Sequence, residues 1–162
     1  MSNEMKDWLR DRAENAQWWV SKYPFLRITD NGVCPWHKTD VIESHWLDEL
    51  PEGWTYTFGQ QMCDEILEAL GKFIDRWHII QVKEKFGEMC IYAYWDTDGL
   101  SDEAINELKI ARHKIEDIIH KYAIVSFNTC VYCGAPADFR TVKGWVAPYC
   151  KSCYKRMFWN NE

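Results

Sequence analysis

Apolar residues recur every three or four positions in three stretches of the chain, and this period predicts amphipathic helices. The first stretch covers residues 5–20, with Pro24 just beyond its end. The second covers residues 58–77, and its acidic residues lie mostly on the opposite side. The third covers residues 105–122, where Ser101 is expected to be the N-cap. Three helices are therefore expected.

A different pattern separates the second and third helices. Residues 79–83 and 89–95 are rich in β-branched and aromatic residues, and a loop that contains Gly87 separates them. This arrangement predicts an antiparallel hairpin. Strict alternation then places four residues on one face of its second strand. These are Met89, Ile91, Ala93 and Trp95.

The stretch before the second helix gives weaker signals. Residues 25–28 resemble a short strand, and the sequence at 30–32 is typical of a tight turn. Residues 34–56 contain two prolines and three tryptophans without a clear period, which favours an irregular segment pinned by its aromatic side chains.

Composition indicates one folded unit. The chain has 162 residues, of which 15% are aromatic, and no linker-like tract interrupts it. We predict an α+β fold with amphipathic helices packed on a small antiparallel sheet, as a body of residues 1–128 with a C-terminal zinc ribbon of residues 129–162. The start is charged where a signal peptide is apolar, and no run is long enough to span a membrane. A cytoplasmic protein is expected.

Four of the seven cysteines form two pairs that predict a zinc site. Cys130 and Cys133 make one Cys-x-x-Cys pair, Cys150 and Cys153 make the other, and sixteen residues separate the pairs. Four thiolates leave no open position on the ion, so we expect one structural Zn²⁺ and no enzymatic activity. An odd number of cysteines without an export signal also argues against a disulfide scaffold.

Charge is distributed unevenly. The net charge is −6, but residues 130–162 carry +3, which leaves −9 on the other 129 residues. Residues 39–71 contain eight acids and no Lys or Arg. The acids are Asp40, Glu43, Asp48, Glu49, Glu52, Asp64, Glu65 and Glu68. They form either a solvated face or a surface that attracts a basic partner.

The basic end of the chain supports an alternative function. Its cationic residues alternate with aromatic ones, a composition that can bind nucleic acid through charge and stacking. The cations are Arg140, Lys143, Lys151, Lys155 and Arg156. We therefore keep a nucleic-acid-binding zinc ribbon as the alternative to protein binding.

Two further groups of residues are weaker candidates. Cys34 and His37 have the spacing of half a metal site, which Cys63, Cys90 or His45 would complete only if the fold brought them together. Otherwise Cys63 and Cys90 are expected in or beside the core. A metal-dependent nuclease would need Asp96, Asp98 and Glu88 to act together.

The chain resembles a family of small uncharacterised proteins of phages and prophages in Gram-positive bacteria. The resemblance covers most of the chain and rests on the segments 22–27, 46–51, 58–63 and 82–87, and on the Cys130 to Cys153 tail. Relatives often have an arginine in the stretch that follows residue 87, where this chain reads Glu88-Met-Cys-Ile-Tyr92.

The resemblance implies phage origin and a zinc ribbon but brings no activity or catalytic residue. Small phage proteins without catalytic motifs commonly bind and block a host protein. We therefore expect an inhibitory protein binder in the host cytoplasm, of the anti-CRISPR type that blocks a Cas nuclease. The acidic segment would suit the basic surface of such a target.

Overall fold

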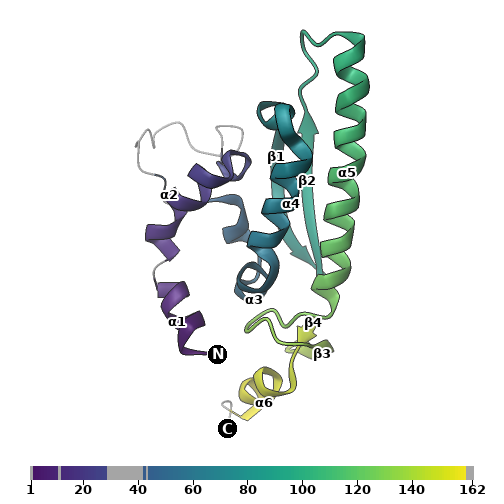
Figure 1. The fold of residues 1–162 in the computed structure, drawn as a ribbon. Helices are drawn as coiled ribbons and strands as arrows, with labels where there is room; N and C mark the ends of the chain where they lie inside the picture. The colour runs from purple at the N-terminus through teal and green to yellow at the C-terminus, as the bar shows by residue number, and fades with distance from the viewer. Residues whose placement is uncertain (1, 11, 29–41, 43, 160–162) are drawn as a thin grey trace.

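The long helix α5 (Asp102–Phe127) and an antiparallel hairpin of β1 (Trp77–Lys85) and β2 (Glu88–Trp95) form the frame of the molecule. The computed structural model describes residues 2–10, 12–28, 42 and 44–159. In Figure 1, helix α4 (Gln60–Leu70) lies between the viewer and the hairpin, with α5 alongside. The structure confirms the predicted α+β class, with helices packed on a small antiparallel sheet.

Helix α5 begins where the sequence predicts. The Ser101 hydroxyl accepts a hydrogen bond from the Ala104 backbone N–H at 3.2 Å, which satisfies one of the unpaired donors of the first turn. Leu108, Ile115 and Tyr122 are buried along its inner side. The helix continues five residues beyond the predicted stretch, as far as Phe127, and delivers the chain directly to the first cysteine pair.

The hairpin is tighter than predicted. Lys85 pairs with Glu88, so the loop contains only Phe86 and Gly87. Both have positive φ, at 52° and 83°, as a type I′ turn requires. Met89 is buried and the other three residues of the predicted inner face pack against the core, which confirms that face. A bulge after Ile79 leaves Ile80 exposed.

The N-terminal part is helical, as predicted, but the structure has two helices, α1 (Asn3–Arg10) and α2 (Arg12–Lys22), in place of the single helix expected over residues 5–20. The predicted strand at 25–28 is wrong, because Pro24–Leu26 forms a 3₁₀ turn. Phe25 and Leu26 are consecutive and both buried. A strand would point them to opposite faces, whereas a turn directs both into the core. The predicted turn at 30–32 lies outside the described residues.

The segment before α4 is more ordered than its sequence suggests. Trp46–Glu49 forms a 3₁₀ turn, and α3 (Glu52–Trp54) continues through a π-helical turn at Thr55–Gly59 into α4. Helix α4 ends at Leu70, earlier than predicted, because Gly71 has a φ of 48° and begins a 3₁₀ segment that extends to Arg76. Trp77 therefore opens β1 instead of closing a helix.

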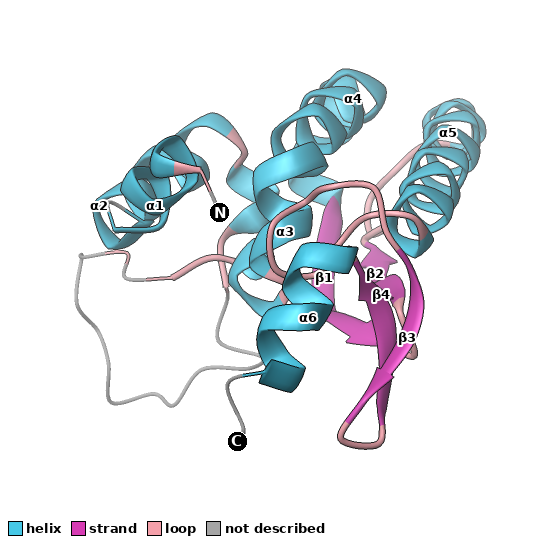
Figure 2. Cartoon of the chain, turned by 90° about the horizontal axis from the view of Figure 1, so that it is seen from below, coloured by secondary structure: helices cyan, strands magenta, loops and turns pink. Residues whose placement is uncertain are grey.

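The C-terminal part is a second hairpin followed by a helix. Strands β3 (Asp138–Val142) and β4 (Trp145–Tyr149) are antiparallel and lead into α6 (Lys151–Trp159), which the sequence analysis did not predict. In Figure 1 this hairpin and α6 lie at the lower end of the molecule, below the frame of β1, β2 and α5, and in Figure 2, which is seen from below, they lie toward the viewer.

One apolar cluster unites the body. Its fully buried members come from α2, the 3₁₀ turns, α3, α4, the first hairpin and α5, and they include Tyr23, Trp54, Met62 and Ile115. Stacked rings of Trp54, Phe58 and Tyr122 continue from α3 to α5. Among the helices described, none combines the length and apolarity of a bilayer crossing.

Candidate metal centre and the cleft beside it

The four predicted cysteines come together at the end of the β3–β4 hairpin. Cys130 and Cys133 lie in the turn after α5, Cys150 follows β4, and Cys153 lies in the first turn of α6. Their four Sγ atoms all lie within 4.8 Å of one another. Cys130, Cys150 and Cys153 are buried and Cys133 is partly exposed.

The spacing of the sulfur atoms fits a tetrahedral metal ion. With metal–sulfur bonds of about 2.3 Å, two sulfurs of a Zn–thiolate tetrahedron lie roughly 3.8 Å apart. The Sγ atoms of Cys133 and Cys150 are 3.6 Å apart, far longer than a disulfide bond. The cluster is therefore compatible with a bound metal ion that has four protein ligands.

Two hydrogen bonds are donated to sulfur atoms of the cluster. The Cys153 backbone N–H donates to the Cys150 Sγ at 3.4 Å, and the Arg156 guanidinium donates to the Cys153 Sγ at 3.0 Å. Burial alone would raise the pKa of Cys150, but this backbone N–H and the neighbouring thiols outweigh it and lower that pKa to about 7. Burial raises the pKa of Cys153 to about 12. A cation is needed to hold all four as thiolates.

The first cysteine pair is docked on the backbone of α3. The Gly53 N–H donates to the Val131 carbonyl at 3.0 Å, and the Trp54 indole N–H donates to the Thr129 carbonyl at 2.8 Å. A Cβ at Gly53 would lie 2.6 Å from the Gly134 nitrogen and closer still to the Cys130 carbonyl oxygen. Only glycine allows this approach, so the metal centre and the body share a close-packed junction.

The five cations of the nucleic-acid hypothesis have different surroundings. Arg140 donates to the Tyr149 carbonyl at 3.2 Å, pairs with Asp138 and lies 5.1 Å from the centre of the Tyr154 ring. Arg156 binds the Cys153 sulfur. These two arginines contact other residues of the ribbon. The three lysines are exposed on the hairpin turn and on α6. They are Lys143, Lys151 and Lys155.

Of the eight acids, the six that the structure describes have different surroundings. Asp40 and Glu43 lie outside the described residues. On α4, Asp64 accepts a hydrogen bond from the Tyr23 hydroxyl at 2.6 Å, and Glu65 accepts one from the Tyr122 hydroxyl at 2.8 Å. Lys22 and Lys121 lie beside these carboxylates. The fold therefore supplies cations to a segment that contains no Lys or Arg in its own sequence.

The other acids of this segment lie mainly before α4. Glu49, Glu52 and Glu68 are exposed, and Glu68 lies on α4, away from the other two along the chain. Asp48 is partly buried and its Oδ2 accepts a hydrogen bond from the His45 backbone N–H at 2.9 Å. Asp48 and Glu52 border a cleft between the body and the ribbon.

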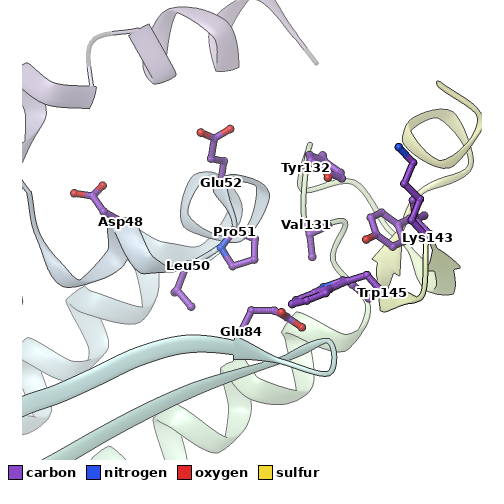
Figure 3. A pocket seen from close by; sticks show the side chains of 12 residues that line it. Asp48, Leu50, Pro51, Glu52, Glu84, Val131, Tyr132, Lys143 and Trp145 are labelled. Carbon is purple, nitrogen blue, oxygen red and sulfur yellow. The ribbon is translucent and has the colours of Figure 1, made fainter. Parts of the chain in front are cut away.

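This cleft has a volume of about 600 Å³ and was not predicted. The body contributes Glu84 near the tip of the first hairpin, and the ribbon contributes Trp145 from β4. In Figure 3 the Trp145 ring and the Glu84 carboxylate point toward one another, and Pro51 lies on the side of α3. Tyr132 and Tyr149 stack at 5.9 Å in the ribbon wall. The Lys143-Gly144 turn was the sequence signal that could have placed Trp145 in a hairpin.

The residues proposed to complete a metal site with Cys34 and His37 form no metal-binding group among the described residues. Cys34 and His37 lie outside them. Cys63 is fully buried in the core, and burial raises the pKa of its thiol, so it is held neutral. Cys90 lies on β2, and His45 stacks on Trp19 with ring centres 5.4 Å apart.

The residues of the nuclease hypothesis are not brought together. Glu88 begins β2 and Asp96 follows its last residue. At about 3.3 Å per residue, the two ends of this strand are more than roughly 20 Å apart. Asp96 instead accepts a hydrogen bond from the Asp98 backbone N–H at 2.9 Å and lies 3.6 Å from the Arg76 guanidinium. These contacts link the loop after β2 to Arg76, the residue that precedes β1.

Comparisons of the chain with protein-family models, with curated proteins and with solved structures gave no match.

Proposed function

We propose that this protein is a zinc-stabilised binder of a host protein, and that its target is a basic, nucleic-acid-handling enzyme of the Cas type. The observation that carries the proposal is the junction between body and ribbon. There, exposed aromatic side chains lie beside carboxylates in a cleft that is large enough for part of a partner protein. Phage origin enters only through the family resemblance.

Zinc is the ion that suits this ligand set. Four cysteine ligands at tetrahedral spacing are typical of structural zinc sites, which have no open position for substrate or water. Elemental analysis of purified protein should find one zinc per chain. Iron at the same stoichiometry, with its thiolate charge-transfer absorption, would contradict the zinc assignment.

Exposed aromatic residues support a binding role. Phe86 is 77% exposed and Trp145 is 63% exposed, and each lies in or next to a hairpin turn. Aromatic side chains of this kind often dominate the energy of protein interfaces. The net charge of −6 favours a basic target and would speed association with it.

The test is an affinity pull-down of the zinc-loaded protein from lysate of a Gram-positive host, with and without nuclease treatment. The expected result is one host protein that survives nuclease, is lost with Trp145→Ala and is retained with Ile110→Ala, a control at an exposed apolar residue of α5. Recovery of nucleic acid alone would overturn the proposal. Purified Cas nuclease with its guide RNA then tests the finer claim, since stoichiometric protein should block DNA cleavage.

The nucleic-acid-binding ribbon is retained as the second candidate because of α6. Lys151 and Lys155 are exposed and four residues apart, so they lie on one side of this helix. A complex formed through them should weaken steeply as salt increases, and the double variant Lys151→Glu with Lys155→Glu should abolish it. Salt-insensitive affinity would contradict this candidate.

A further inference from the structure

The cleft between body and ribbon combines features that together select one kind of ligand. Its lining includes apolar side chains, a wall of aromatic rings and several charged groups, with carboxylates in excess. Asp48, Glu52 and Glu84 contribute three negative charges and Lys143 contributes one positive charge. The lining therefore has more acidic than basic side chains, a composition that favours a cation over a phosphate.

The aromatic wall narrows the choice among cations. Trp145 is 63% exposed although it lines the cleft, so much of its ring is open to a ligand. An indole face attracts a cation electrostatically, and a planar guanidinium can also stack on it. Leu50, Pro51 and Val131 provide apolar surface for the methylene stem of a long side chain.

Glu84 is held in place for an ionic contact. Its Oε1 accepts a hydrogen bond from the Gly87 backbone N–H at 2.6 Å, which fixes the carboxylate at the tip of the hairpin. In Figure 3 this carboxylate points toward the Trp145 ring, and both side chains line the cleft. A guanidinium that stacked on the indole would therefore lie within reach of a preorganised carboxylate, and charge-assisted hydrogen bonds of this type are strong.

We infer that this cleft receives an arginine side chain of a protein partner, with the guanidinium between Trp145 and Glu84 and its stem against Pro51. The inference rests on the proposed protein-binding function and specifies the chemistry of its target. The volume of about 600 Å³ exceeds one side chain, so neighbouring backbone of the partner also enters. Trp145 and Glu84 are binding residues in this assignment.

The first test titrates the zinc-loaded full-length protein with the peptide acetyl-Gly-Gly-Arg-Gly-Gly-amide and follows tryptophan indole N–H signals by NMR. The Trp145 signal is identified by its loss in Trp145→Phe. We expect a saturable shift of that signal with an affinity on the order of millimolar, weakened by salt. The same peptide with citrulline, a neutral isostere of arginine, should give no saturable shift.

Variants separate charge from shape. Glu84→Gln keeps an oxygen that can accept from Gly87 but removes the charge, and it should weaken the arginine peptide by about fivefold or more. Glu103→Gln, at an exposed acid on α5, should leave affinity unchanged. Equal binding of the citrulline peptide, or a larger shift of Trp145 with a ten-residue thymidine oligonucleotide, would overturn the inference.

The same variants distinguish failure of the inference from failure of the proposed function. If wild type and Glu84→Gln capture the same host protein equally, the arginine cleft is wrong and protein binding stands. If no protein is captured but the arginine peptide still binds at Trp145, the cleft stands and the proposed function fails.

Discussion

The two hairpins of this protein have the same turn but different support. Phe86-Gly87 joins β1 to β2 and Lys143-Gly144 joins β3 to β4, and in both pairs the two residues have positive φ. The first hairpin packs one face against the apolar core. In the second hairpin, β3 has no buried residue. The buried residues of that hairpin are the last three of β4, next to Cys150.

This difference shows where the apolar core ends and the cysteine cluster begins. Strand β2 contributes Met89 to a core that includes α4 and α5. The ribbon instead contains a small cluster formed by the cysteines and nearby alanines. We predict that so small a cluster does not offset the entropy of ordering about thirty residues, and that the ribbon therefore needs a bound metal ion to fold. Because the ribbon packs closely on Gly53, we expect the stability of the body to depend on the folded ribbon.

The largest expected effect comes from loss of the metal. Cys133→Ser, or removal of the metal by a chelator, should unfold β3, β4 and α6, because structural zinc contributes about 10 to 16 kcal/mol of apparent binding free energy in zinc-finger peptides. The body should survive with its free energy of unfolding lowered by at least about 4 kcal/mol. Amide NMR spectra and thermal unfolding measure the two effects.

Cys90→Ser is the control for this prediction. Cys90 lies on β2 and its sulfur belongs to no cluster among the described residues that could hold a metal. The variant should keep its metal and its ribbon signals. Ribbon signals that survive in metal-free protein would show that packing suffices for both hairpins, and the comparison would fail.

The second prediction concerns the junction of the two regions. Gly53→Ala places a Cβ 2.6 Å from the Gly134 nitrogen, so the first cysteine pair must shift away from α3. We expect the free energy of unfolding to fall by about 2 to 3 kcal/mol, as for overpacked sites. Gly59→Ala is the control. Gly59 has a helical φ of −55°, and a Cβ added there would lie no closer than 3.3 Å to its nearest neighbour, the Thr55 methyl group. Equal stability of the two variants would mean that the ribbon does not dock on α3.

The third prediction tests a polar tie within the body. Tyr122→Phe removes the hydrogen bond to Glu65, and we expect a loss of about 1.5 to 3 kcal/mol at pH 7, as for bonds to charged groups. Burial and the Glu65 carboxylate raise the pKa of Tyr122, so the native state keeps this phenol protonated. The unfolded phenol ionises near pH 10, and therefore this stabilisation is lost as pH rises above about 10.

Denaturant unfolding of wild type and Tyr122→Phe at several pH values checks this linkage. The difference in stability between the two proteins should be constant below about pH 9 and narrow above pH 10. A difference that stays constant up to pH 11 would show that the phenol is not held neutral by the fold.

Sequence patterns predicted those elements whose boundaries are set locally. Helix α5 has a capping serine and a sustained apolar period, and β2 alternates strictly, so both could be recognised. The turn at Pro24–Leu26 could not, because its conformation follows from the need to bury two consecutive side chains. Helix α6 is short and begins directly after Cys150 of the cysteine cluster, so its sequence alone carries little signal.

The candidate site divides in the same way. The cysteine cluster was predictable because the ligand spacing is local within each pair. The cleft was not, because Glu84 and Trp145 are far apart in sequence and line one cleft only when the body packs on the ribbon, at Gly53 beside the first cysteine pair and at Gly87 beside Phe139. The pairing of Lys22 and Lys121 with acids on α4 depends on tertiary packing for the same reason.

The smallest expected effect concerns the turns that the two hairpins share. Phe86 has a φ of 52° and is 77% exposed. The left-handed backbone costs free energy that burial of the side chain offsets only in small part. Asn tolerates this conformation better, and Asn-Gly is the preferred type I′ sequence. Phe86→Asn should therefore raise the free energy of unfolding by about 0.5 to 1 kcal/mol. Lys143→Asn, at φ 51° in the second hairpin, is the matched variant and should stabilise by a similar amount.

Partner binding separates the two turns. If Phe86 is kept because it contacts the target, then Phe86→Asn should stabilise the protein and weaken capture of the host protein, while Lys143→Asn should stabilise without reducing capture. Strained residues that persist against a more stable alternative tend to lie at functional sites. If both variants capture the partner as wild type does, the exposed phenylalanine has no binding role and the two turns differ only in what lies beneath them.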